Sequence, residues 1–555
     1  MNIKFLRYSL LVSSLCFAFA ASAQDKPQPS PPTGTLTEEI EVVRPYKPVL
    51  ADAVKIRRNP DLKNETPFKP VLTYTIIDKK LELNSNIKEL QAQKMADEQA
   101  VVLSNNYAKG AAGNFGTALG EVYVNTGRDQ ALQAGVFFKH LSQQGELDKQ
   151  QFSRQEVGVF GRSIADSYSV SGNLGYDRYS TFFYGFNPVS SAPVSMDRQR
   201  FGTISGQVEL MNNYSEASTL DYAVNVNAYR FTNIDEASEG TFLISGSVNK
   251  AMSIFNAGIN ASADLTSVKD EAYKIGNSIL RANPYVKLQG KGFLLNVGAN
   301  IVQEFGERSR TNIFPAVSAE VHVITDYAIL FGGLSGDALK TSLRDLGMEN
   351  PYLSKNISIQ NSLEKMNIHA GLKGNTGAEF GYKVLAYYKT VGDLQLFMND
   401  PAQVNRFNVI YDNGNSKIFG FEGQLSVKAS DVLSITGKAN LYDYELATQQ
   451  EAWFKPSLRL SSNARAQLSQ KLFVDGELLF QGETYARTMA SSLPSGEQIV
   501  KIKSFMDLSA GAGYQVNPKI GVFLRANNLL GNSYQKYLYY SKLGLNIFGG
   551  LNYSF

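Results

Sequence analysis

The chain has a single cysteine among its 555 residues. Cys16 lies in the apolar run 8–20, which two basic residues precede and the small residues Ala21-Ser22-Ala23 follow. This is the pattern of a cleaved secretory signal over residues 1–23, so we expect the mature chain to begin at Gln24. The mature chain then has no thiol, which excludes disulfides, cysteine-ligated metals and cysteine nucleophiles.

An excess of charge of either sign is also missing. The full chain has 54 basic and 51 acidic residues, a net charge of +3. Removing the signal, which has two basic residues and no acidic one, lowers the net charge to about +1. A balance this close to neutral gives no reason to expect a nucleic-acid partner or another polyanion.

Long hydrophobic runs are absent after the signal, since none reaches the ~18 residues of a membrane helix. Any crossing of a membrane must then be made by strands. Strand patterns are frequent: polar and apolar residues alternate over several segments, among them 203–210, 222–228, 433–441 and 474–481. One face of each segment is apolar throughout, which is typical of strands that face lipid.

The final residues show the same alternation and end on an aromatic. Leu551, Tyr553 and Phe555 would face lipid, while Asn552 and Ser554 would face a lumen. A terminal phenylalanine resembles the assembly signal that the outer-membrane barrel-assembly machinery recognises. We therefore expect these three residues to act as that signal and the chain to contact outer-membrane lipid.

Counting alternating runs between turn signals over residues 105–555 gives about 22 strands, and dividing the segment by ~20 residues per strand and connection agrees. The sequence therefore predicts an all-β fold, a transmembrane antiparallel β-barrel of about 22 strands. The lumen of such a barrel is too wide for side chains to fill. Some further segment must close it.

Several motifs of the last third resemble those of TonB-dependent receptors. The segment 413–422, with the turn pair Asn413-Gly414, resembles a hairpin ending in Gly-x-Glu, and 453–456 resembles a proline-bearing turn before a late strand. The segment 507–534 resembles the family's penultimate hairpin, and 544–555 resembles its closing strand. Residues 105–128 resemble the opening strands of plug-poor Bacteroidetes members. The resemblance implies an outer-membrane transport or receptor protein of a Gram-negative bacterium.

Two positions depart from the family's usual pattern. Leu530 stands where an aromatic is usual, and Lys542-Leu543-Gly544 stands where a Pro-Gly-Arg turn is common. The larger departure is N-terminal, because residues 24–104 contain no sequence like the family's globular plug. The expected domains are thus the signal 1–23, a short irregular periplasmic segment 24–104, and the barrel 105–555.

Within that segment, Glu38-Glu39-Ile40-Glu41-Val42-Val43 resembles a TonB box, the extended stretch that pairs with the edge of the TonB sheet. The alternative is a short strand or a solvated linker, since acidic and β-branched hexamers are common. Without a plug, a TonB box would have no gate to open, so it would be either a remnant or a segment that pulls on a partner.

An internal repeat follows the TonB-box-like stretch. Pro45-Tyr46-Lys47-Pro48 recurs 22 residues later as Pro67-Phe68-Lys69-Pro70. Two prolines three residues apart keep the chain extended and display the aromatic and the lysine on a stiff ribbon. Such a ribbon can dock on the inner wall of the barrel or on a periplasmic partner; the alternative is an ordered tether.

Catalytic residues are scarce. His140, His322 and His369 have no metal-ligand spacing. His140 and Ser142 share one strand face, a spacing similar to that of outer-membrane lipid A deacylases, but a base and nucleophile need a third, orienting group, and Glu146 lies in a predicted turn. We expect neither an enzyme nor a cofactor.

One connection is longer than the others. Residues 336–359 contain leucines with helical spacing, so we expect a loop with a short helix, which either caps the barrel wall or folds inward to narrow the lumen. Aromatic residues near strand ends are expected to form an interfacial belt: Phe182, Phe183, Tyr184, Tyr537, Tyr539 and Tyr540.

Two hypotheses for function follow. The chain is either a transport or receptor barrel coupled to TonB, or an outer-membrane scaffold whose N-terminal segment recruits a periplasmic or lipoprotein partner.

Overall fold

The computed structural model describes residues 106–126, 131–186, 194–213, 220–252, 255–324, 327–376, 379–430, 432–489 and 497–555. The signal, the TonB-box-like stretch and the Pro-aromatic-Lys-Pro repeat lie outside these residues, so their roles and the proposed domain boundaries stay predictions.

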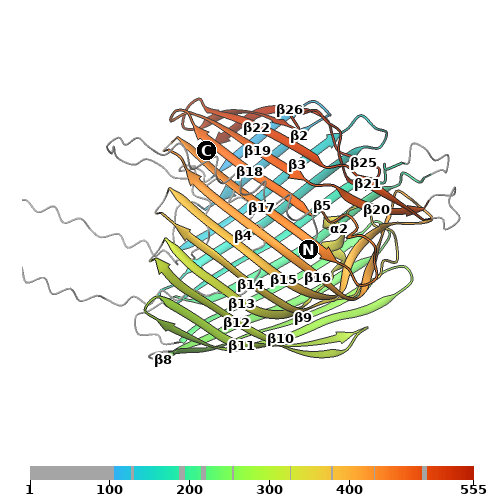
Figure 1. Cartoon of the computed structure of the whole chain (residues 1–555). Helices are drawn as coiled ribbons and strands as arrows, with labels where there is room; N and C mark the ends of the chain where they lie inside the picture. Colours follow the sequence, from blue (N-terminus) through green and yellow to red (C-terminus); the bar gives the residue numbers. More distant parts are fainter. Residues whose placement is uncertain are drawn as a thin grey trace, which may run out of the picture. The chain divides into compact units, whose positions relative to one another are not determined.

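Twenty-two antiparallel strands form one closed sheet, because β1 pairs with both β2 and β26 (Figure 1). The first eleven are β1 (Tyr107–Gly113), β2 (Ala118–Asn125), β3 (Leu132–Gln144), β4 (Gln151–Ile164), β5 (Tyr168–Phe182), β6 (Arg198–Asn212), β7 (Leu220–Asn233), β8 (Ser238–Met252), β9 (Phe255–Lys269), β10 (Lys274–Gly290) and β11 (Phe293–Gly306). The others are β12 (Arg310–Ile324), β13 (Ala328–Leu339), β14 (Ser362–Asn375), β15 (Phe380–Asn399), β16 (Phe407–Lys428), β17 (Leu433–Glu445), β18 (Leu458–Gln467), β19 (Leu472–Gln481), β22 (Phe505–Gln515), β23 (Ile520–Asn527) and β26 (Asn546–Ser554). The predicted all-β barrel is confirmed.

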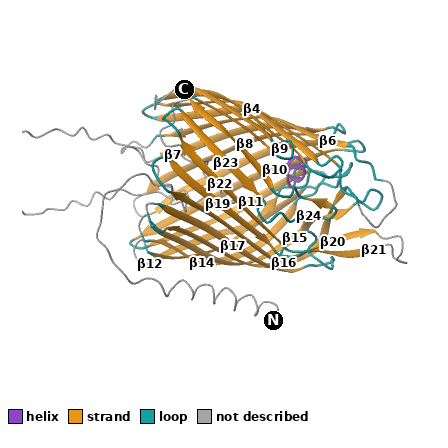
Figure 2. Ribbon diagram, turned by 90° about the horizontal axis from the view of Figure 1, so that it is seen from above, coloured by secondary structure: helices purple, strands orange, loops and turns teal. Residues whose placement is uncertain are grey.

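Three smaller elements belong to the connections between barrel strands. β20 (Thr484–Met489) pairs with β21 (Glu497–Ile502), and β24 (Gln535–Tyr537) pairs with β25 (Tyr540–Ser541). The helix α2 (Leu343–Glu349) lies between β13 and β14, at the end of the barrel where Figure 2 also shows β20 and β21.

The two ends of the barrel differ. At one end, which we call the terminus end, the Phe555 N–H donates to the Asn106 carbonyl at 3.0 Å. The other end, which we call the loop end, carries α2, the β20–β21 hairpin and the β24–β25 pair (Figure 1). The predicted short helix is therefore present, and it lies at the loop end.

The outer face of the barrel is apolar. Large apolar side chains that alternate along the strands remain exposed, for example Ile204 at 57 % and Val208 at 53 %. The polar residues between them, such as Asn225 and Asn227 of β7, face the lumen. Since hydrocarbon offers no hydrogen bonds, a closed sheet with this sidedness can cross a membrane with every strand paired.

No helix among the described residues is both long and apolar enough to span a membrane.

The turn that we expected at Asn413-Gly414 is wrong, because β16 runs through both residues and the β15–β16 connection comes earlier, between Asn399 and Phe407. The register of β15 and β16 shifts at this point, where Asp393 of β15 has a φ of 55° and Gly414 a φ of 129°. A bulge that demands positive φ selects the same residues as a tight turn. Sequence alone therefore cannot separate the two.

Candidate functional site

Three connections from different thirds of the rim meet over the mouth at the loop end. Around the closed sheet, eight strands (β6 to β13) separate the β5–β6 connection from β13–β14, eight more (β14 to β19, β22 and β23) separate the latter from β23–β26, and six (β26 and β1 to β5) complete the circle. Connections spaced this widely can touch only by crossing the mouth.

Tyrosines make the contact between these connections. The rings of Tyr352 and Tyr540 stack with their centroids 3.5 Å apart, and Tyr184 packs edge-on against both, at 5.9 Å from Tyr352 and 4.9 Å from Tyr540. Each of the three residues is at most 8 % exposed. We call the buried group around these three tyrosines the mouth cluster. Its other large members include Phe183, Phe407, Trp453, Phe454 and Tyr537.

The mouth cluster corrects our expectation of an interfacial belt. Phe183, Tyr184, Tyr537 and Tyr540 are 1–6 % exposed and pack among loops, away from lipid. The sequence does not distinguish an aromatic residue near a strand end that faces the membrane interface from one that lies over the lumen.

Three tyrosine hydroxyls of the cluster donate to backbone carbonyls of other connections. Tyr537 donates to the Glu349 carbonyl at 2.7 Å, Tyr184 donates to the Ser541 carbonyl at 3.0 Å, and Tyr540 donates to the Asn405 carbonyl. Burial raises the pKa of Tyr184 and raises that of Tyr540 well above its usual range, so both phenols stay neutral donors. The apolar contact is thus also a specific one.

Residues 340–361, which we call the lid segment, carry Tyr352 into the cluster and are fixed to the barrel wall by polar contacts. The buried Glu239 carboxylate of β8 accepts from the Leu343 N–H and from the Tyr229 hydroxyl, both at 2.6 Å. Lys340 forms an ion pair with Asp264 of β9 and contacts the Thr266 hydroxyl at 2.5 Å. These groups hold the start of α2 against β7–β9.

The end of the lid segment returns to the neighbouring strands. Asn361 donates to Glu304 of β11 at 2.8 Å and to Asn277 of β10 at 2.7 Å. Asn277 in turn donates to the Thr341 carbonyl at 2.9 Å, which ties the two ends of the segment together. The sequence left open whether this connection caps the barrel wall or folds inward. The lid segment does both, because it lies against the wall and also crosses the mouth.

A polar pocket of about 270 Å³ lies between the lid segment and the inner wall. Asn225, Asn227 and Tyr229 of β7 form one side, and Ser342, Arg344 and Asp345 of the lid segment form another. The Arg344 guanidinium lies 3.8 Å from the centre of the Tyr229 ring. A ligand in this pocket would contact the wall and the lid segment together.

The lumen wall carries charges of both signs that pair between adjacent strands or across one intervening strand. Arg154 and Asp177 lie 2.6 Å apart, Lys373 and Glu320 2.8 Å, and the ion pair of Arg525 with Glu477 measures 2.7 Å. A wall of this polarity faces water rather than a packed core, as the wall of a transport passage or a binding chamber does.

His140 and Ser142 lie within hydrogen-bond distance, but the group that contacts the other histidine nitrogen is unsuitable for catalysis. His140 Nε2 lies 3.3 Å from Ser142 Oγ, and the Gln155 amide lies 3.2 Å from His140 Nδ1. A neutral amide cannot stabilise an imidazolium as the carboxylate of a hydrolase triad does. The described residues also contain no group of three or more side chains able to hold a metal ion.

The residues of the expected assembly signal point outward. Leu551, Tyr553 and Phe555 are 59 %, 46 % and 45 % exposed, and β26 that carries the first two closes the barrel against β1. The Tyr553 and Phe555 rings stack at 5.8 Å. Their recognition by the assembly machinery stays a prediction.

A closed barrel with an apolar outer face and a polar lumen defines a transmembrane protein of the Gram-negative outer membrane. More narrowly, the chain has the barrel fold of TonB-dependent receptors, so the family resemblance holds at the level of the fold.

Three solved structures illustrate this likeness. The FrpB iron transporter from Neisseria meningitidis superposes with a TM-score of 0.64 at 9 % identity, over 82 % of this chain and 81 % of that one. The ferric-catecholate import receptor Fiu from E. coli K12 gives 0.62 at 10 % identity over 81 % and 82 %, and the siderophore receptor PirA from Acinetobacter baumannii 0.62 at 11 % over 82 % and 80 %. At these identities the likeness is one of fold.

No family model matches the chain, and no curated protein does.

Proposed function

We propose that the chain is an outer-membrane transport or receptor barrel whose lid segment opens and closes the mouth at the loop end. The observation that carries this proposal is the contact of three widely spaced connections through Tyr184, Tyr352 and Tyr540. A wide polar lumen closed by loops has a closure that can move without unfolding the sheet. Because similar folds belong to an iron transporter and a ferric-catecholate import receptor, iron chelates are the first ligands to test.

We further propose that residues 24–104 close the lumen in place of a full plug, with the two Pro-aromatic-Lys-Pro units docking on the barrel. The experiment is ion conductance in planar bilayers for four proteins: the mature chain, a chain lacking 24–104, a chain with 341–360 replaced by a Gly-Ser turn, and the double variant. We expect only the double variant to conduct steadily.

The single variants separate the two closures. Steady conductance after replacing 341–360 alone would show that the lid segment is the whole closure and would refute the N-terminal stopper. Four equally silent proteins, each still folded, would refute the transport proposal and favour a scaffold.

Coupling to TonB is proposed through Glu38-Glu39-Ile40-Glu41-Val42-Val43. A box of this kind binds by adding an extended strand to a sheet edge, and proline removes a backbone donor from that strand. Ile40→Pro should therefore abolish energy-dependent uptake of the ligand while leaving the amount of barrel in the membrane unchanged. Normal uptake in this variant would exclude the coupling.

The scaffold alternative is favoured by one sequence feature, the doubling of the Pro-aromatic-Lys-Pro unit. If the repeat recruits a periplasmic or lipoprotein partner, the double variant Tyr46→Ala/Phe68→Ala should release a protein that co-purifies with the natural chain. Recovery of the same proteins with both chains would argue against recruitment.

A further inference from the structure

The outward face of β5–β10 carries an array of cations near the loop end. Along each strand these residues share the outward side with the exposed apolar residues, as Arg178 does with Leu174 and Tyr176. The array, which we call the outer basic array, consists of Arg178, Arg198, Arg200, Arg230, Lys269 and Lys274.

Strand register places these cations in adjacent rows. Arg178 lies opposite Gly202, and the same row continues through β7 and β8 to Lys269 and Lys274, which lie opposite each other. Arg230 belongs to the next row toward the terminus end, opposite Gly240. Five strand spacings of ~4.8 Å separate the ends of the first row, so the array extends about 24 Å around the barrel.

The carboxylates nearest the array, Asp270 and Glu271 in the turn between Lys269 and Lys274, are engaged elsewhere, since Asp270 accepts from the Asn356 N–H and Glu271 pairs with Lys355. None of the array's six members forms an ion pair in the part of the chain that the structure describes, and the outward positions of β5–β10 contain no acidic residue. Arg198 lies over the Phe182 ring at 5.2 Å. By contrast, the outward Lys417 of β16 pairs with Glu445 of β17 at 2.6 Å. The outer basic array is thus a feature of one side of the barrel.

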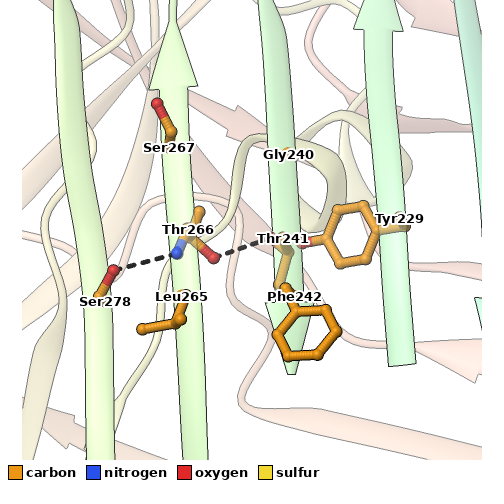
Figure 3. A pocket seen from close by; sticks show the side chains of 8 residues that line it. All are labelled: Tyr229, Gly240, Thr241, Phe242, Leu265, Thr266, Ser267 and Ser278. Atoms are coloured by element: carbon orange, nitrogen blue, oxygen red, sulfur yellow. Dashed lines mark hydrogen bonds between the residues drawn. The ribbon is translucent and has the colours of Figure 1, made fainter. Parts of the chain in front are cut away.

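A groove of about 450 Å³ lies beside the array on β7–β10 (Figure 3). Small residues open it: Gly240 and Ser267 lie opposite each other, and a side chain at Gly240 would meet no atom within 4 Å. Phe242 and Leu265, which are 45 % and 51 % exposed, form its apolar part. Cations therefore stand next to an apolar recess on a surface that faces lipid.

The chemistry of this surface fits a lipid with a phosphorylated headgroup. Guanidinium groups bind phosphate oxygens in pairs, and ammonium groups bind them as point charges. The loop end faces the outer leaflet if the chain termini lie on the periplasmic side, as in other outer-membrane barrels. We propose that the outer basic array and the adjoining groove form a binding site for a phosphorylated lipid of the outer leaflet, with its phosphates on the arginines and an acyl chain against Phe242 and Leu265.

The test is native mass spectrometry of the purified full chain in detergent with synthetic bis-phosphorylated lipid A as the probe. The triple variant Arg178→Gln/Arg200→Gln/Arg230→Gln should bind at least tenfold more weakly than the natural chain. The natural chain should also lose about tenfold in affinity when both phosphates are removed from the probe. In a titration with sodium chloride, binding should fall as salt rises, because ion pairing to phosphate is screened.

Lys250→Gln is the matched control, since Lys250 is an exposed cation on β8 near the terminus end. It should bind lipid A within twofold of the natural chain. Equal binding of phosphorylated and phosphate-free lipid by the natural chain would overturn the proposal, because the cations would then only extend their charged ends into water. Equal losses in Lys250→Gln and the triple variant would also overturn it.

Discussion

Asp412 shows how one buried carboxylate fixes a connection. It is fully buried and accepts bonds from the Ser416 hydroxyl, from the N–H groups of Ala447, Thr448 and Gln449, and from the Thr448 hydroxyl, at 2.6–2.9 Å. It lies beyond Lys417, the last β16 residue toward the loop end that pairs with β17. Burial opposes ionisation, but the hydrogen bonds outweigh it and lower the pKa of Asp412 to about 2.

Asp412→Asn should loosen the β17–β18 connection, because the NH₂ group of the asparagine amide would face backbone N–H groups that need an acceptor. Losing charge-assisted bonds of this kind costs on the order of 2 kcal/mol of local stability. Hydrogen exchange in residues 446–457 should therefore become ~30-fold faster. Exchange measured by mass spectrometry, with residues 307–309 as the internal reference, tests this. Unchanged exchange at 446–457 would contradict the assigned role.

The same carboxylate predicts a pH dependence. A folded-state pKa below the ordinary value of 3.8 means that the stabilisation is complete above about pH 4 and is lost as the pH falls through about 2. Limited proteolysis at 446–457 in the natural chain should therefore be slow at pH 5 and rise near pH 2. Asp412→Asn should show no such step, and a step of equal size in both chains would assign it to other groups.

At the scale of an element, the lid segment combines a polar contact with the wall and an aromatic contact across the mouth. The aromatic contact depends on the stacking of Tyr352, from the lid segment, on Tyr540. The polar side spreads over β8–β11, through residues such as Glu239 and Asn277. We therefore expect the segment to move by parting at the tyrosines while its wall contacts remain.

Joining the two tyrosine positions should stop this movement. In a chain lacking 24–104, Tyr352→Cys and Tyr540→Cys joined by a short cleavable thiol crosslinker should suppress bursts of conductance, and cleavage should restore them. Each single cysteine variant treated in the same way is the control. Bursts that persist in the crosslinked protein would exclude movement at this contact.

The alternation of polar and apolar residues predicts the barrel strands well, because lipid on one face of the sheet imposes it. Segments such as 203–210 alternate because lipid touches every second residue, so the strands and their lipid-facing sides could be predicted from this alternation. The short helix of the lid segment was predicted, but its contacts across the mouth could not be, because Tyr184 bonds a carbonyl 357 residues away and Tyr537 one 188 residues away. Contacts this distant leave no local signal.

At the scale of the whole molecule, closure of the barrel depends on β26, which pairs with β23 and β1. Phe555→Ala should lower the fraction of chain that reaches the outer membrane in folded, heat-modifiable form by at least half, if Phe555 is part of the assembly signal. Leu545→Ala, which changes an exposed apolar residue just before β26, is the control. Equal folded fractions for Phe555→Ala and the natural chain would refute the signal.

The barrel wall is a single sheet, so its two faces share one backbone. Glu239 points inward and holds α2, while the next residue, Gly240, opens outward into the groove beside the outer basic array. One peptide bond thus separates the anchor of the lid from the surface that touches the leaflet. If the lipid that we propose displaced the strand at Gly240, it would strain the hydrogen bond from Leu343 to Glu239, and the surrounding membrane would then act on the mouth.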